Sequence, residues 1–99
     1  MNIHYLNIEK MIIVSYDISE DKMRTNFSKM LKKNGAIRLQ FSVYEVRNTK
    51  RIMDNLVAKI EAYSKHFTPD DSVIIFDVDS DKLTKYGCAI HRDQAVVYF

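Results

Sequence analysis

The 99-residue chain has few of the residues on which several kinds of site depend. Its one cysteine, Cys88, cannot form an internal disulfide and has no second cysteine with which to bind zinc, so we expect a small buried apolar residue there. Two glycines are too few for a loop that cradles phosphates. The sequence therefore disfavours redox chemistry and glycine-rich nucleotide binding.

Long hydrophobic runs are also missing. No stretch approaches the roughly 18 apolar residues of a membrane span, and the N-terminus lacks the charged, apolar and small-residue order of a secretion signal. We therefore expect a cytoplasmic protein without a membrane partner. Because 46% of the residues are hydrophobic, the chain has enough apolar material for one core, and it is too short for two domains.

Charge is unevenly distributed, although the net charge is only +2. Between residues 22 and 59 there are ten Lys or Arg and two acids, whereas residues 70–81 contain five Asp. A basic middle of this kind favours a surface that binds a polyanion. An ordinary solvated helix face has the same composition, so charge alone leaves both interpretations open.

Residues 12–19 have the sequence Ile-Ile-Val-Ser-Tyr-Asp-Ile-Ser, and we expect the other elements to be arranged around this segment. The β-branched apolar run predicts a buried central strand that ends at Asp17. A carboxylate at such a strand end is a candidate functional group. The alternative is that Asp17 caps the next helix or starts a turn, and the local sequence does not separate the two.

A first helix is predicted from Ser19, whose hydroxyl can accept a bond from a free backbone amide, to Asn34 and Gly35. Its apolar positions share one side of the helix: Met23, Phe27, Met30 and Leu31. Three lysines share another side, because offsets of seven and eleven residues return to nearly the same angle: Lys22, Lys29 and Lys33. This helix therefore has separate apolar and basic faces.

Alternation of apolar and polar residues predicts two strands over residues 36–40 and 42–47. A tight hairpin and one long bulged strand both fit, and we favour the hairpin on topology. A second helix is expected from Asn48 or Thr49 to the turn around Pro69. Residues 72–77 are apolar at successive positions, which indicates a strand covered on both faces or held in an interface.

The chain ends with an apolar segment, residues 95–99, after a short helical turn or loop expected over residues 80–87. An uncovered strand of this kind favours association, so we expect it to pair with another strand, such as that of a second copy. The element order predicts an α+β, ferredoxin-like βαββαβ antiparallel sheet with two helices on one face and an extra C-terminal strand. We expect an extension over residues 1–10 and a single domain over 11–99, with 92–99 as a strand for dimerisation or partner docking.

Three short motifs carry a resemblance to a known family. They are VSYDIS at residues 14–19, LQFSVYE at residues 39–45 and DSV at residues 71–73, with a basic helix after the first motif and another helix after the second. In this order and spacing they resemble the CRISPR-associated Cas2 family, the small dimeric subunit of the spacer-acquisition machinery.

The resemblance implies roles for individual residues. Asp17 matches an aspartate that faces its own copy across the two-fold axis, and some members are described as metal-dependent nucleases, so Asp17 is the candidate catalytic residue and Mg²⁺ ligand. Arg24 and Arg38 match basic positions associated with nucleic acid, and Tyr44 matches an aromatic position. Asn26 stands where a further arginine is often found. With the three lysines of the first helix, the candidate nucleic-acid-binding set is Lys22, Arg24, Lys29, Lys33, Arg38 and Tyr44.

Two classes of function follow from this resemblance. In the first, a homodimer acts as an adaptor that holds integrase subunits apart and binds the backbone of a short DNA duplex. In the second, it is a magnesium-dependent endonuclease that cuts RNA or DNA through paired Asp17 residues; a related toxin-like ribonuclease is a third reading. We favour the adaptor, because one carboxylate per chain without a nearby His or Lys pair is a poor set of groups for fast hydrolysis.

Overall fold

Strands and helices follow one another along the chain in the order that the sequence predicts. The computed structural model describes residues 9–91, and the predicted strand within residues 92–99 lies outside them. The elements are β1 (Lys10–Asp17), α1 (Asp21–Lys33), β2 (Ile37–Gln40), β3 (Val43–Arg47), α2 (Lys50–Ser64), β4 (Ser72–Asp79), η2 (Ser80–Lys82) and α3 (Cys88–His91). Within this range, no helix combines the length and the apolar character needed to cross a bilayer.

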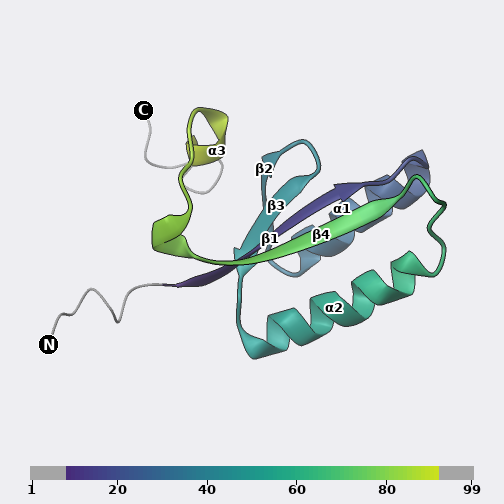
Figure 1. The fold of residues 1–99 in the computed structure, drawn as a ribbon, viewed down its shortest axis with the longest axis horizontal. Coiled ribbons are helices and arrows are strands. Elements are labelled where there is room, and N and C mark those ends of the chain that lie inside the picture. Colours follow the sequence, from purple (N-terminus) through teal and green to yellow (C-terminus); the bar gives the residue numbers. More distant parts are fainter. Residues whose placement is uncertain (1–8, 92–99) are drawn as a thin grey trace, which may run out of the picture.

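The four strands form one antiparallel sheet in the order β2-β3-β1-β4. β1 is central, with Val14 opposite Tyr44 of β3 and Ile75 of β4. Helices α1 and α2 lie on the same side of the sheet (Figure 1). This is the ferredoxin-like arrangement that the sequence predicts.

Alternation along β1 determines which side chains enter the core. Ile12, Val14 and Tyr16 point toward the helices and are buried, because successive residues of a strand face opposite sides of the sheet. From α1, Phe27 is fully buried, and its ring lies 4.8 Å from that of Tyr16 and 5.2 Å from that of Tyr63. These contacts fix both helices against the central strand.

The opposite side of the sheet is only partly covered. Over β2 and β3, the segment after η2 folds back, and the Lys85 Nζ lies 2.7 Å from an oxygen of Glu45, which is 4% exposed. Over β4, by contrast, Ile74 and Phe76 are 54% and 51% exposed. Of the two interpretations of this strand, cover on both faces is wrong for the described residues, and an interface remains.

The hairpin interpretation of residues 36–47 is confirmed. β2 and β3 pair antiparallel with an irregularity between Arg38 and Gln40, and Ser42 takes a positive φ of 70° in the turn. Gly35, with φ of 87°, follows α1 where a left-handed residue was expected. Thr49 caps α2 through its side chain, which agrees with the predicted start of this helix at Asn48 or Thr49.

Two local predictions are wrong. Ser19 does not cap α1; Glu20 does, by accepting a hydrogen bond from the Met23 amide at 3.0 Å, because the Ser19 hydroxyl is bonded elsewhere. Cys88, the first residue of the short helix α3, is exposed rather than buried.

Candidate functional site

Asp17 is the last residue of β1 and is exposed. It lies opposite Ser72 of β4, on the same side of the sheet as Ile74 and Phe76, because alternate positions of paired strands share a face. Its carboxylate makes no hydrogen bond or ion pair with the other described residues, and α1 is capped by Glu20. The capping interpretation of Asp17 is therefore wrong, which leaves its carboxylate available to a ligand.

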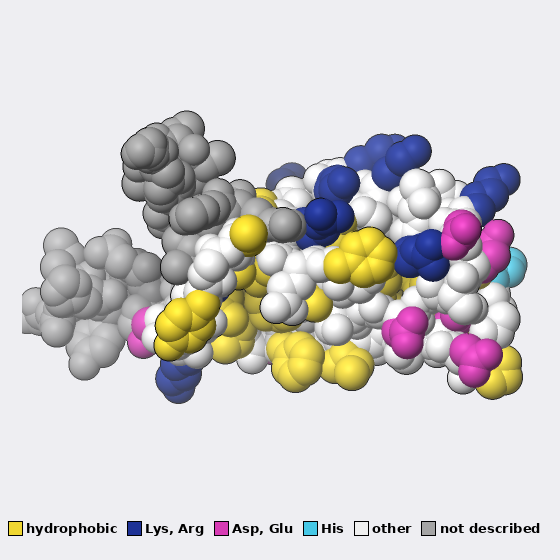
Figure 2. Space-filling model, turned by 90° about the horizontal axis from the view of Figure 1, so that it is seen from above, with side chains coloured by type: hydrophobic (Ala, Val, Ile, Leu, Met, Phe, Trp, Pro, Cys, Tyr) yellow, Lys and Arg dark blue, Asp and Glu magenta, His cyan; other side chains and the backbone are white. Residues whose placement is uncertain are grey.

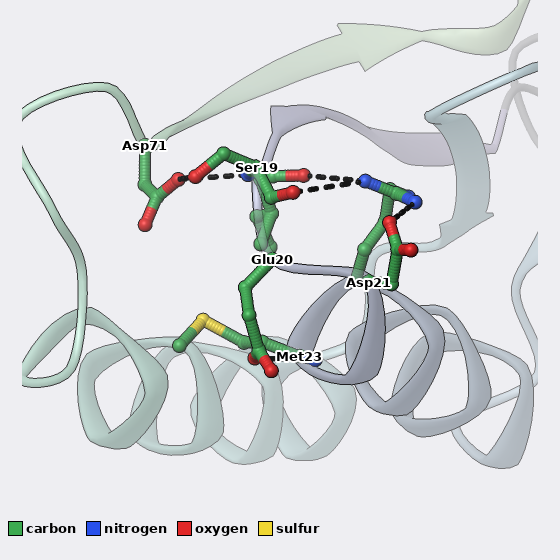
Figure 3. A network of polar contacts seen from close by, with 7 residues as sticks. Ser19, Glu20, Asp21, Met23 and Asp71 are labelled. Atoms are coloured by element: carbon green, nitrogen blue, oxygen red, sulfur yellow. Dashed lines mark hydrogen bonds and ion pairs between the residues drawn. The ribbon is translucent and has the colours of Figure 1, made fainter.

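The loop after Asp17 is held by a network of polar contacts (Figure 3). The amide and the hydroxyl of Ser19 both donate to Asp71 at 2.9 Å, and the Thr68 amide donates to the same carboxylate at 2.8 Å. From α1, Arg24 donates to the Ile18 carbonyl at 3.0 Å and pairs with Asp21. The network ties the end of β1 to the turn before β4 and so fixes the backbone next to Asp17.

Asp71 gives this network a pH dependence. Hydrogen bonds from the backbone amides of Ser19 and Thr68 lower the pKa of its carboxyl from 3.8 to about 2. Because the folded-state pKa is lowered, the stabilisation is fully present above about pH 4 and is lost as the pH falls toward 2. We expect the free energy of unfolding of wild type to exceed that of Asp71→Asn at pH 5, with the difference shrinking between pH 4 and 2. Urea titrations across this range measure it, and a difference that grows on acidification would contradict the assignment.

The three lysines predicted to bind nucleic acid lie on α1 with exposed side chains. Lys29 and Lys33 line a groove between α1 and α2. Lys22 lies about two helical turns before Lys29, near the start of α1. Arg38 is exposed on β2. The structure thus brings Lys29 and Lys33 together and places Arg38 on a separate strand.

The other two predicted residues are engaged within the protein. The Arg24 guanidinium binds the loop that follows β1. Tyr44 is 1% exposed, and its hydroxyl lies 2.6 Å from the Ser28 hydroxyl. Its ring therefore belongs to the core and has no surface on which a base can stack in this conformation.

Sequence reasoning missed the α2 side of the groove. The groove has a volume of about 580 Å³, and its α2 wall includes Asn55 and Lys59. A second hollow of about 410 Å³ shares Lys33, Asn34 and Asn55 with it and adds Arg51. Spacing by four residues places Arg51, Asn55 and Lys59 on one side of α2, which is the signal in the sequence. Which side of α1 faces them depends on helix packing, and that is not visible in either helix alone.

The described residues contain no cluster of three or more His, Cys, Asp or Glu able to hold a metal ion. Mg²⁺ is commonly bound through one or two carboxylates while it keeps several waters. A single exposed, unengaged Asp17 fits such a site when a second copy supplies the other carboxylate. One chain by itself provides too few ligands.

Comparison with known proteins gives one family and one related protein. The family described as CRISPR associated protein Cas2 matches residues 10–86. A protein of Pyrobaculum aerophilum named CRISPR-associated endoribonuclease Cas2 2 is 34% identical over 68 residues, which are 69% of this chain and 72% of the relative.

Solved structures support the fold. A crystal structure described as that of cas2 has a TM-score of 0.65 and 23% identity, over 80% of this chain and 85% of the other. A hypothetical protein from Thermus thermophilus has a TM-score of 0.63 and 23% identity, over 80% of this chain and 92% of the other. Both likenesses concern the arrangement of strands and helices.

Proposed function

Because this chain belongs to the Cas2 family of CRISPR-associated proteins, we propose that it is a homodimeric adaptor of spacer acquisition, which bridges integrase subunits and binds the backbone of short duplex DNA. The observation that carries the proposal is the separation of two surfaces. In Figure 2, hydrophobic side chains gather along the lower side of the molecule, with others near its centre, and most of the visible Lys and Arg side chains lie along the upper side. An adaptor needs two such surfaces, one for its own copy and one for a polyanion.

The dimer is proposed to form through the uncovered side of β1 and β4. We call Ile13, Ile74 and Phe76 the open-face patch. Ile13 of β1 lies opposite Phe76 of β4, and Ile74 lies two residues before Phe76 on the same side of β4. A two-fold interface buries the same patch of both copies, which removes exposed apolar surface from water twice. Asp17 lies on this side of the sheet, so such packing carries both Asp17 residues into one interface.

The basic side is proposed to bind phosphates. Lys29 and Lys33 project from α1, on the side of the sheet away from the open-face patch, and make no ion pair with the described residues. Lysines on a helix contact phosphates without reading the sequence, and their affinity falls steeply with salt. A dimer built on the open-face patch leaves these lysines accessible.

A second function, magnesium-dependent cleavage of RNA or DNA, is favoured by two observations. The Pyrobaculum aerophilum relative is named an endoribonuclease, and the Asp17 carboxylate is exposed and unengaged. Mg²⁺ held between two Asp17 carboxylates would polarise a phosphoryl oxygen and lower the pKa of a bound water. Arg24 would support such a site by holding the loop beside Asp17. The toxin-like ribonuclease is a variant of this second function.

Replacing Asp17 with Ala separates the two functions. For an adaptor, spacer acquisition in cells should stay within about twofold of wild type, because the loss of an exposed, unbonded carboxylate leaves the core and the basic side unchanged. For a nuclease, metal-dependent cleavage by the purified protein should be lost. Sequencing of the repeat array and a cleavage assay with RNA and DNA measure the two outcomes. Acquisition lost in Asp17→Ala, with dimer and partner binding intact, would contradict the adaptor.

A further inference from the structure

The groove between α1 and α2 carries cations on both walls. We define the helix groove by Lys29 and Lys33 on α1 and by Arg51 and Lys59 on α2. The described residues that line it include no Asp or Glu. The four cations therefore face one another across a space that contains no opposite charge from the described chain.

Some lysines outside the groove are paired with acids. Lys50 lies 2.8 Å from Asp54 on the outer side of α2, and Lys10 lies 2.6 Å from Asp79. The four groove cations make no ion pair or hydrogen bond with the described residues. Like charges in a concave surface concentrate anions there, because each cation adds to the same local potential.

Polar contacts fix the width of the groove. The side-chain amide of Asn55 donates to the Asn34 side-chain oxygen at 2.5 Å. The side-chain nitrogen of Asn34 in turn donates to the Met30 carbonyl at 2.9 Å. This bridge ties the end of α1 to the first half of α2. Lys33, Asn34 and Asn55 border both hollows, so the space continues past the bridge toward Arg51.

We propose that the helix groove is a track for one phosphodiester strand, in which Arg51 and Lys59 of α2 contact phosphates together with Lys29 and Lys33 of α1. This rests on the proposed function and assigns α2 a part in it. Between residues 26 and 33, α1 rises by about 10 Å at 1.5 Å per residue. The phosphates of one strand advance by about 3.4 Å along the axis of B-DNA and lie farther apart along the strand itself, so the groove is long enough for two neighbouring phosphates.

The groove contacts the backbone rather than the bases. Ammonium and guanidinium groups bind phosphate oxygens, and the amides of Asn26 and Asn55 add neutral polar groups to the same lining. Tyr63 lines the groove, is half-buried and packs edge-on against Phe27, so its ring is not free to stack between bases. Binding in the groove is therefore independent of base sequence and strongly dependent on salt.

A charge-matched pair of variants tests the track. Arg51→Glu/Lys59→Glu reverses the α2 wall, and Lys32→Glu/Lys65→Glu makes the same change in net charge with exposed lysines outside the groove lining. A fluorescent duplex and a single strand of about 20 nucleotides are titrated at several salt concentrations. We expect the groove variant to lose about tenfold or more in affinity, with the dependence of log K on log salt reduced by about 1 for each lost contact. The control should lose no more than about threefold.

The outcomes distinguish this inference from the proposed function. If wild type binds neither nucleic acid, the proposed function fails; if the groove variant binds as wild type does, only the track fails. Equal losses in both variants would also overturn it, because they would reflect overall charge. Should the reversed variant not fold by circular dichroism, Arg51→Ala/Lys59→Ala takes its place with the same expectation of sign. Inorganic phosphate that displaces the strand at equal phosphate concentration would indicate a single-phosphate site and contradict a track.

Discussion

Replacing Phe76 with Glu is expected to convert the proposed dimer into monomers. Phe76 is 51% exposed and lies opposite Ile13 in the open-face patch. Around a two-fold axis, one substitution places two carboxylates in the same apolar interface, and like-charge juxtaposition there costs several kcal/mol. At about 1.4 kcal/mol for each tenfold change, the dissociation constant should rise about a hundredfold or more. Light scattering over a range of protein concentrations measures the change.

Val57→Glu is the matched control for this experiment. Val57 is 36% exposed on α2, away from the open-face patch, so the variant adds the same charge to an exposed apolar position. It should remain a dimer with an unchanged melting temperature, and Phe76→Glu should keep the monomer's secondary structure. A Phe76→Glu protein that stays dimeric at wild-type concentrations would show that the copies associate through another surface.

Reversing Lys29 and Lys33 to Glu should lower duplex affinity for any base sequence by about tenfold to a hundredfold at moderate salt. Each reversal removes a phosphate contact and adds a repulsive charge, and the two residues stand one helical turn apart on the same wall. The loss should diminish as salt rises, because the remaining interaction involves fewer released counterions. Fluorescence anisotropy with two unrelated duplexes checks both statements.

The control for this experiment is Lys32→Glu, which lies on α1 between the two lysines but outside the groove lining. Its affinity should fall no more than about threefold. Affinity for one duplex falling much more than for the other would contradict backbone binding, and unchanged affinity of Lys29→Glu/Lys33→Glu at low salt would exclude α1 as the binding surface.

The element order was predictable because periodicity in this chain is clear. Ile12, Val14 and Tyr16 alternate with less buried residues on β1, as expected for a strand with one covered face. Met23, Phe27, Met30 and Leu31 mark the inner side of α1, and Phe27 and Leu31 are fully buried. The three motifs at residues 14–19, 39–45 and 71–73, in their order and spacing, also predicted the family correctly. These features depend on the spacing of residues along the chain, which can be read from the sequence directly.

The errors concern interactions between distant segments. The Ser19 hydroxyl binds Asp71, 52 positions away, so the capping role passes to Glu20. The burial of Tyr44, whose hydroxyl meets the hydroxyl of Ser28 on α1, is likewise a contact between distant segments that a motif comparison does not reveal. The four-residue spacing of α2 is visible in the sequence, but its facing α1 is not, since Asn34 and Asn55 meet only after the helices pack.

Two copies of this chain are proposed to join integrase subunits to a short duplex, and the mass of the assembled particle measures this joining. Purified chain, integrase subunit and duplex DNA are mixed, separated by size and weighed by light scattering. We expect one particle that contains two copies of this chain, duplex and integrase subunits together. A chain that elutes as a monomer, apart from both integrase and duplex, would contradict it.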